Sequence, residues 1–130
     1  MCLTNIGNKL LIAEKDLMVY KVLKLYEGTL VSPFYDMPYE FLTRYDNSEP
    51  DEISGSPIDN IYFVEGGFYH AYIDKDAAVA NAKVIEHFYR KKCVIYNATI
   101  PRGTKYYLGN AKDICAKSII INEELDNLQS

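Results

Sequence analysis

Hydrophobic residues recur along most of this chain with the two-residue period of β-strands, interrupted by clusters of turn residues. The strongest example is Asp16–Lys24, "DLMVYKVLK", which is rich in residues of high β-propensity and contains no Gly or Pro. About seven short strands are predicted, at Asp16–Lys24, Thr29–Ser32, Ile61–Glu65, Phe68–Ile73, Cys93–Ile100, Lys105–Leu108 and Ile114–Ile121, with weaker segments at Lys9–Ala13 and Glu40–Thr43. The turns between most of these segments are short, which favours antiparallel pairing.

One segment, Lys75–Tyr89, follows the helical period instead. The apolar residues at helical spacing are Ala78, Ala82, Ile85 and either Phe88 or Tyr89. Asp74 is a favourable N-cap, and the basic residues at 90–92 suit the negative end of the helix dipole. The sequence therefore predicts one helix with a single buried face.

Strands that cluster before and after one helix, without β-α-β alternation, indicate an α+β fold. We expect a mostly antiparallel, curved sheet with the helix packed on one face. The 130 residues fit a single domain, 1–130. Within it, the polar segment Asp46–Asn60 holds five acids and two prolines and predicts an exposed acidic loop, while Asn122–Ser130 predicts a frayed tail.

Charge and hydropathy narrow the range of partners. The chain has 18 acidic and 14 basic residues and a net charge of −4, which disfavours binding to long nucleic acid. No apolar run approaches the roughly 18 residues that span a membrane, and the first residues lack the pattern of a signal peptide. We therefore expect a cytoplasmic protein with no membrane partner. The net negative charge does not exclude a small anionic ligand, because a few well-placed cations are enough to bind one.

Residues with catalytic or metal-binding potential do not form a recognisable motif. The three cysteines, Cys2, Cys93 and Cys115, have no metal-ligand spacing, and their odd number fits reduced thiols in a cytosol. The two histidines, His70 and His87, have no partner at ligand spacing. The chain also lacks GxSxG, Walker and GxGxxG sequences. The sequence thus predicts no catalytic residue, no metal and no cofactor.

The stretch "ATIPRGTKYYLG" at 98–109 holds the first group of candidate ligand-binding residues. Arg102 can form a forked contact with a phosphate, Lys105 can act as a point charge, and turn amides can add donors. Tyr106 offers a ring on which a base can stack. The alternative interpretation is an ordinary β-turn with solvated cations and tyrosines that belong to the sheet.

A second group of candidates lies on the strands before the helix. Alternation along Phe68–Ile73 places His70 and Tyr72 on one face, where they could line a pocket, and Lys21 lies on the strongest predicted strand. The alternative is that His70 is a polar residue on a half-exposed strand. The 12 tyrosines also allow two interpretations, half-buried positions at the sheet rims or a surface that stacks on a ligand or partner.

Three stretches together resemble a family of small, uncharacterised proteins of phages, prophages and gut anaerobes. They are the start "MCL" with "VYKVL" at 19–23, "GGFYHAY" at 66–72, and "ATIPRGTKYYLG" with "CAKSIII" at 115–121. The resemblance spans most of the chain but includes no catalytic motif. Small phage proteins include homo-oligomeric "sponges" that sequester nucleotide second messengers of bacterial immunity, so the resemblance implies such a role in the host cytosol.

A strand followed by "IPRGTKYY" is also similar to the closing strands of ADP-ribosyltransferase-like domains. This similarity implies a split sheet with a nicotinamide-dinucleotide cleft. The sequence departs from the pattern at two places. Those enzymes carry an acid just before the corresponding turn, where residues 96–99 read Tyr-Asn-Ala-Thr, and Lys21 stands where they usually place an arginine.

Three hypotheses for function follow from these observations. The first is a non-enzymatic protein that binds a small anionic, nucleotide-like ligand, with an anti-defence sponge as its most specific form. The second is a divergent or inactive ADP-ribosyltransferase-like domain. The third is an interaction module that uses a tyrosine-rich surface to bind a host protein.

Overall fold

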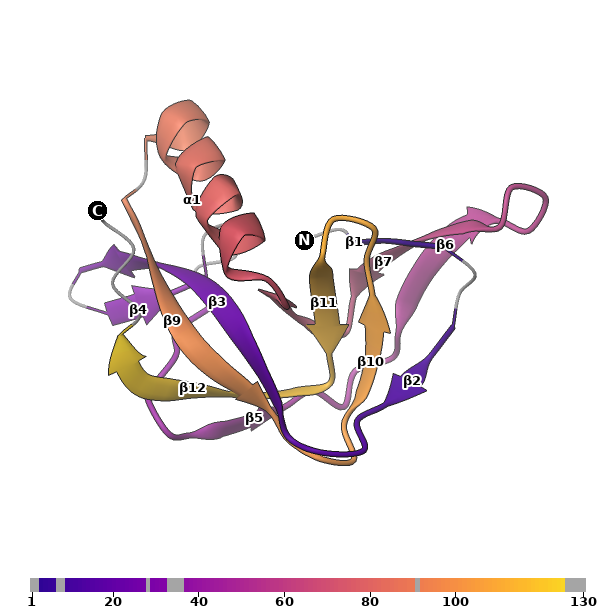
Figure 1. Cartoon of the computed structure of the whole chain (residues 1–130), viewed down its shortest axis with the longest axis horizontal. Coiled ribbons are helices and arrows are strands. Elements are labelled where there is room, and N and C mark those ends of the chain that lie inside the picture. The colour runs from indigo at the N-terminus through magenta and orange to yellow at the C-terminus, as the bar shows by residue number, and fades with distance from the viewer. Residues whose placement is uncertain (1–2, 7–8, 28, 33–36, 91, 126–130) are drawn as a thin grey trace.

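The structure, a computed structural model, describes residues 3–6, 9–27, 29–32, 37–90 and 92–125. These residues form one helix and twelve strands arranged in two antiparallel sheets (Figure 1). The predicted α+β class, with a mostly antiparallel sheet and one helix, is confirmed. The predicted number of strands was too small.

The larger sheet has nine strands, eight of which follow the order β2-β10-β11-β8-β3-β9-β12-β5, while β4 pairs with β3. Their bounds are β2 Leu11–Ile12, β3 Leu17–Tyr26, β4 Thr29–Val31, β5 Arg44–Asp46, β8 Tyr69–Tyr72, β9 Cys93–Ile100, β10 Lys105–Leu108, β11 Asp113–Ala116 and β12 Ser118–Leu125. The longest pairing joins β3 to β9 over eight residue pairs. By contrast, β3 and β8 are paired only at Tyr20 and Tyr72. The sheet is therefore almost divided between β3 and β8.

The smaller sheet has the order β1-β7-β6, with β1 at Leu3–Ile6, β6 at Glu52–Ser56 and β7 at Ile61–Gly66. Its β6–β7 hairpin extends away from the helix and the larger sheet, as Figure 1 shows. We call residues 52–66 the arm. The inward face of the arm places Val64 in a buried cluster with Tyr107 and Cys115, which attaches the small sheet to β10 and β11.

The helix α1 spans Lys75–Tyr89, and Asp74 caps it by accepting a hydrogen bond from the backbone N–H of Asp76. At its other end Arg90 adopts the left-handed conformation that often terminates helices. The predicted bounds and N-cap are confirmed, and Ala78, Ala82 and Ile85 are buried as expected. The prediction that Phe88 or Tyr89 continues the buried stripe is wrong, because these side chains are 71% and 54% exposed.

Apolar side chains pack on both faces of the central strands. On one face, residues of β3, β8, β9, β11 and β12 form the largest buried cluster, which Tyr39 closes from the loop before β5. On the other face, α1 packs its alanines and Ile85 against Val22, Tyr72 and Ile95. Because β3 contributes to both clusters, its middle residues are buried on both faces, including Lys21 and Lys24.

Three predicted segments differ from the structure. The segment Asp46–Asn60 is largely exposed but is not a continuous loop, because Glu52–Ser56 forms β6 and Asp46 ends β5. The predicted tail begins too early, since Asn122–Leu125 continues β12, and residues 126–130 lie outside the described residues. The single strand predicted at Ile114–Ile121 is two strands, β11 and β12, separated at Lys117.

Replacing Ile85 by alanine should destabilise the fold by about 2–5 kcal/mol, because it leaves a cavity beneath the helix. Ile85 is 1% exposed, whereas its neighbour Val84 is 48% exposed and provides a matched control. Urea denaturation followed by circular dichroism measures both variants. Equal losses for Ile85→Ala and Val84→Ala would contradict the packing of the helix described here.

Candidate functional site

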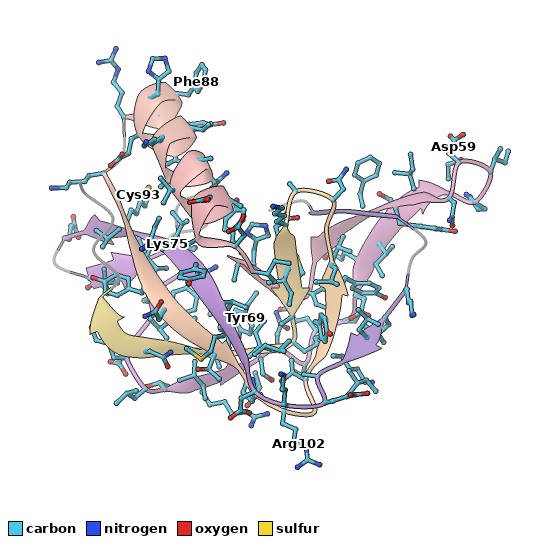
Figure 2. All side chains as sticks on the ribbon, in the orientation of Figure 1. Asp59, Tyr69, Lys75, Phe88, Cys93 and Arg102 are labelled. Atoms are coloured by element: carbon cyan, nitrogen blue, oxygen red, sulfur yellow. The ribbon has the colours of Figure 1, made fainter. Side chains whose placement is uncertain are left out.

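The structure separates the six predicted ligand-binding residues into two groups. Arg102, Lys105 and Tyr106 lie in and just after the connection between β9 and β10, and Figure 2 shows Arg102 projecting from the far edge of the molecule. The other three residues, Lys21, His70 and Tyr72, are buried near the point where β3 and β8 separate. The two groups therefore do not form one site.

The connection Pro101–Thr104 is a β-turn in which Thr104 N–H donates to the Pro101 carbonyl at 3.2 Å. Gly103 has a φ of +87°, as the third position of a type II turn requires. The turn amides are already bonded, because Arg102 N–H donates to Asp16 Oδ1 at 2.8 Å and Gly103 N–H to the Ala13 carbonyl at 2.8 Å. The proposed cradle of turn amides for an anion is therefore absent, and the Asp16 carboxylate would repel an anion there.

The side chains after this turn point in different directions. Lys105 is exposed, while Tyr106 is half-buried and packs against the largest core cluster. Tyr107 lies on the opposite face of β10, within the cluster that attaches the arm. The alternative interpretation of the stretch 98–109, a turn with solvated cations followed by tyrosines of the sheet, fits this geometry.

The remaining predicted residues form a buried polar cluster at the junction of β3 and β8. The Lys21 ammonium donates to the backbone carbonyl of His70 and lies 5.4 Å from the centre of the Tyr39 ring. The ring of Tyr72 packs edge-on against that of His70, with centroids 5.0 Å apart. The predicted shared face of His70 and Tyr72 is confirmed, but His70 is only 9% exposed, so the expectation of a half-exposed strand is wrong.

Sequence analysis missed one member of this cluster, Asp113. Its Oδ2 lies 3.1 Å from Nε2 of His70, and both side chains are buried. The residue begins β11, whose register places it diagonally across from His70. A single acid at the start of the buried stretch Ile114–Ala116 was the available signal, because acids are rarely buried without a partner. Its second oxygen, Oδ1, is buried and has no hydrogen-bond partner among the described residues.

Burial changes the acid–base properties of the cluster. It lowers the pKa of Lys21 from 10.5 to about 8, although the neighbouring Cys115 sulfur offsets part of this effect. Burial also lowers the pKa of His70, an effect that the hydrogen bond to Asp113 opposes and the charge of Lys21 reinforces. The pKa of the Tyr72 hydroxyl is raised by burial and by Asp113, so the hydroxyl stays protonated at neutral pH. Lys21 thus supplies a cation on the face of Tyr39 and the largest core cluster, while His70 and Tyr72 supply a neutral imidazole and a phenol on the face that α1 covers.

The described part of the chain offers few other groups that could bind a metal ion or react as a nucleophile. No group of three His, Cys, Asp or Glu side chains there could hold a metal ion. Cys93 and Cys115 are buried, and Cys2 lies outside the described residues. Of the tyrosine side chains that the structure describes, only Tyr89 is exposed and the others are buried or half-buried, which fits the interpretation that the tyrosines belong to the sheets.

Comparison with known proteins adds no information on which residues form the site. No protein-family model, curated protein or solved structure matches this chain. The resemblance to phage and gut-anaerobe proteins stays a prediction. Within the described ranges, no helix is long and apolar enough to cross a membrane.

The buried lysine should give the stability a measurable dependence on pH. Since folding lowers the pKa of Lys21 to about 8, the folded state favours the neutral amine. Relative to a Lys21→Met variant, the wild-type protein should therefore gain stability as the pH rises from about 8 to 10.5 and show a constant difference below that range. Urea denaturation of both proteins across this range measures the difference, in which contributions from the tyrosines cancel.

Lys105→Met is the control for removing an exposed lysine. If the difference between the wild-type protein and Lys21→Met does not change with pH, Lys21 is better solvated than the structure indicates.

The turn after β9 should depend on its glycine. Gly103→Ala is expected to lower the free energy of unfolding by about 1–2 kcal/mol, because a Cβ is unfavourable at positive φ. No atom lies within 4 Å of the position of that Cβ, so the cost is conformational and not steric. Thermal unfolding measures it, and an unchanged melting temperature for Gly103→Ala would argue against the type II turn.

Proposed function

We propose that this chain is a non-enzymatic protein that binds a small anionic ligand at the junction of β3 and β8. The observation that carries the proposal is the Lys21 ammonium, which is 5% exposed. Among the described residues its contacts are neutral, a carbonyl and an aromatic ring, and no carboxylate pairs with it. Burying a cation without an anion lowers stability, and groups with such perturbed pKa values cluster at functional sites. An anionic ligand would neutralise this charge.

The topology of the sheet supports this location. Since β3 and β8 share one residue pair, separating them breaks few backbone hydrogen bonds. On its other side β3 is held to β9 along eight residue pairs and stays in place. A ligand therefore gains access to Lys21 most easily by replacing the contact between its ammonium and the His70 carbonyl.

The neighbouring groups favour a nucleotide-like ligand. Lys21 suits a phosphate, and the Tyr39 ring beside its ammonium provides aromatic surface for a base. Asp113 Oδ1, buried without a partner in the described chain, can accept a hydrogen bond from a hydroxyl or amino group. Combined with the resemblance to phage proteins, this extends the proposal to a homo-oligomeric sponge that sequesters a nucleotide second messenger.

A thermal-shift screen with inorganic phosphate, cyclic nucleotides and ADP-ribose tests the proposal. A ligand present at about 100 times its Kd stabilises the folded state by about 2.7 kcal/mol, a shift of several degrees in Tm. The shift should be lost in Lys21→Met and retained in the double variant Arg102→Ala/Lys105→Ala, which serves as the matched control.

Two results would contradict the proposal. If none of the ligands shifts Tm at high micromolar concentration, the chain is not a binding protein for these anions. If the double variant loses the shift while Lys21→Met keeps it, the ligand binds at the turn after β9.

A divergent ADP-ribosyltransferase-like activity is the second candidate, and Asp113 is the observation that favours it. The sequence lacks an acid at 96–99, but Asp113 supplies a carboxylate beside His70 in the same cluster as Lys21. The wild-type protein should then transfer labelled ADP-ribose from NAD to proteins of a lysate, with release of nicotinamide, and Asp113→Asn should not. Absence of this transfer with the wild-type protein rejects this candidate and leaves the binding proposal standing.

A further inference from the structure

The outward face of the arm exposes apolar side chains that the core does not use. Ile58, in the turn at the tip, is 95% exposed, and Ile61 and Phe63 on β7 are 38% and 39% exposed. The partners of Ile61 and Phe63 on β6 are the small residues Ser56 and Ser54, which leave both side chains uncovered on that side. The inward face is already occupied, because Val64 packs with Tyr107 and Cys115.

The charged residues of the arm itself have one sign. From Asp46 to Ile73 the chain contains no Lys or Arg. Asp51 is paired with Lys117 at 2.7 Å, but Glu52 and Asp59 are exposed at the two ends of the hairpin, and Figure 2 shows Asp59 at the far end of the arm. Two copies of this acidic surface would repel each other, whereas a basic surface would be attracted to it.

The base of the arm is fixed to the rest of the molecule. The Lys117 ammonium donates to the Glu49 carbonyl at 2.7 Å and lies 4.5 Å from the centre of the Phe68 ring, in addition to its ion pair with Asp51. The third strand, β1, pairs with β7 along four residue pairs. A projecting element held in this way loses little conformational entropy on docking, which favours binding.

We propose that the arm docks on a partner protein that presents apolar side chains flanked by lysine or arginine. Ile58, Ile61 and Phe63 form the apolar contact, and Glu52 and Asp59 pair with the basic flanks. This surface is separate from the junction of β3 and β8 and does not depend on ligand binding there.

Selection of a displayed library of random peptides on the immobilised full-length protein tests this proposal. The enriched peptides should combine apolar residues with lysine or arginine, and their binding should weaken as salt is added. Synthetic copies should bind about tenfold or more weakly to Ile58→Ser/Phe63→Ser and to Asp59→Lys, as expected for loss of central contacts. Phe88→Ser, which removes an exposed aromatic ring from α1, is the matched control and should bind like the wild-type protein.

Several outcomes overturn the proposal. These are no enrichment over the bare support, enriched peptides without basic residues, and equal binding to the wild-type protein and the arm variants. Circular dichroism of each variant separates loss of binding from loss of folding. Sedimentation velocity provides the remaining test, because a dimer that Ile58→Ser dissociates would show that a second copy covers the arm.

Discussion

The Lys21 ammonium donates to the His70 carbonyl at the point where the larger sheet is nearly divided. On one side of this junction β3 continues into β9, β12 and β5, and on the other β8 continues into β11, β10 and β2. One residue pair and one lysine link β3 to β8 by hydrogen bonds, while the largest core cluster packs across both parts. His70 then extends the link to Asp113 on β11. The arrangement places a charged group where a fully paired sheet would have backbone hydrogen bonds.

A buried ammonium without a carboxylate partner among the described residues is unusual in a protein interior. A long apolar side chain would fill the same space without the cost of desolvating an ammonium, and the β3–β8 gap could be closed by further pairing. The position of Lys21 is therefore better explained by what its charge can attract than by what it adds to stability. The turn at Pro101–Thr104 shows the opposite case, because its exposed cations surround a backbone whose donors are all satisfied internally.

Local sequence patterns were sufficient to predict the elements whose residues intrinsically favour the secondary structure that they adopt. The helix Lys75–Tyr89 has its cap, its small apolar face and its basic end in sequence order, so its bounds could be predicted. Strand β6 could not, since Ile53 is its only residue of high β-propensity and the strand is held by pairing with β7.

The residues of the candidate site could also be predicted only where local pattern was enough. Alternation placed His70 and Tyr72 on one face, but Asp113 is 43 residues from His70 and is brought near it only by the pairing of β8 with β11. The choice between Lys21 and Arg102 as the cation of a site also depends on burial, which neither residue type nor spacing reveals. Lys21 is enclosed because helix and loop cover both faces of β3.

The single residue Lys117 between β11 and β12 has a consequence for how the chain folds. Ala116 belongs to one half of the divided sheet and Ser118 to the other. When one half completes its strand pairing, the connection through Lys117 therefore brings the other half close to it. Strand β12 must also wait for β9 and β5, which come from distant parts of the chain. Such non-local contacts are slow to form, and they couple the halves into one cooperative unit that folds on the millisecond-to-second timescale of β-rich proteins.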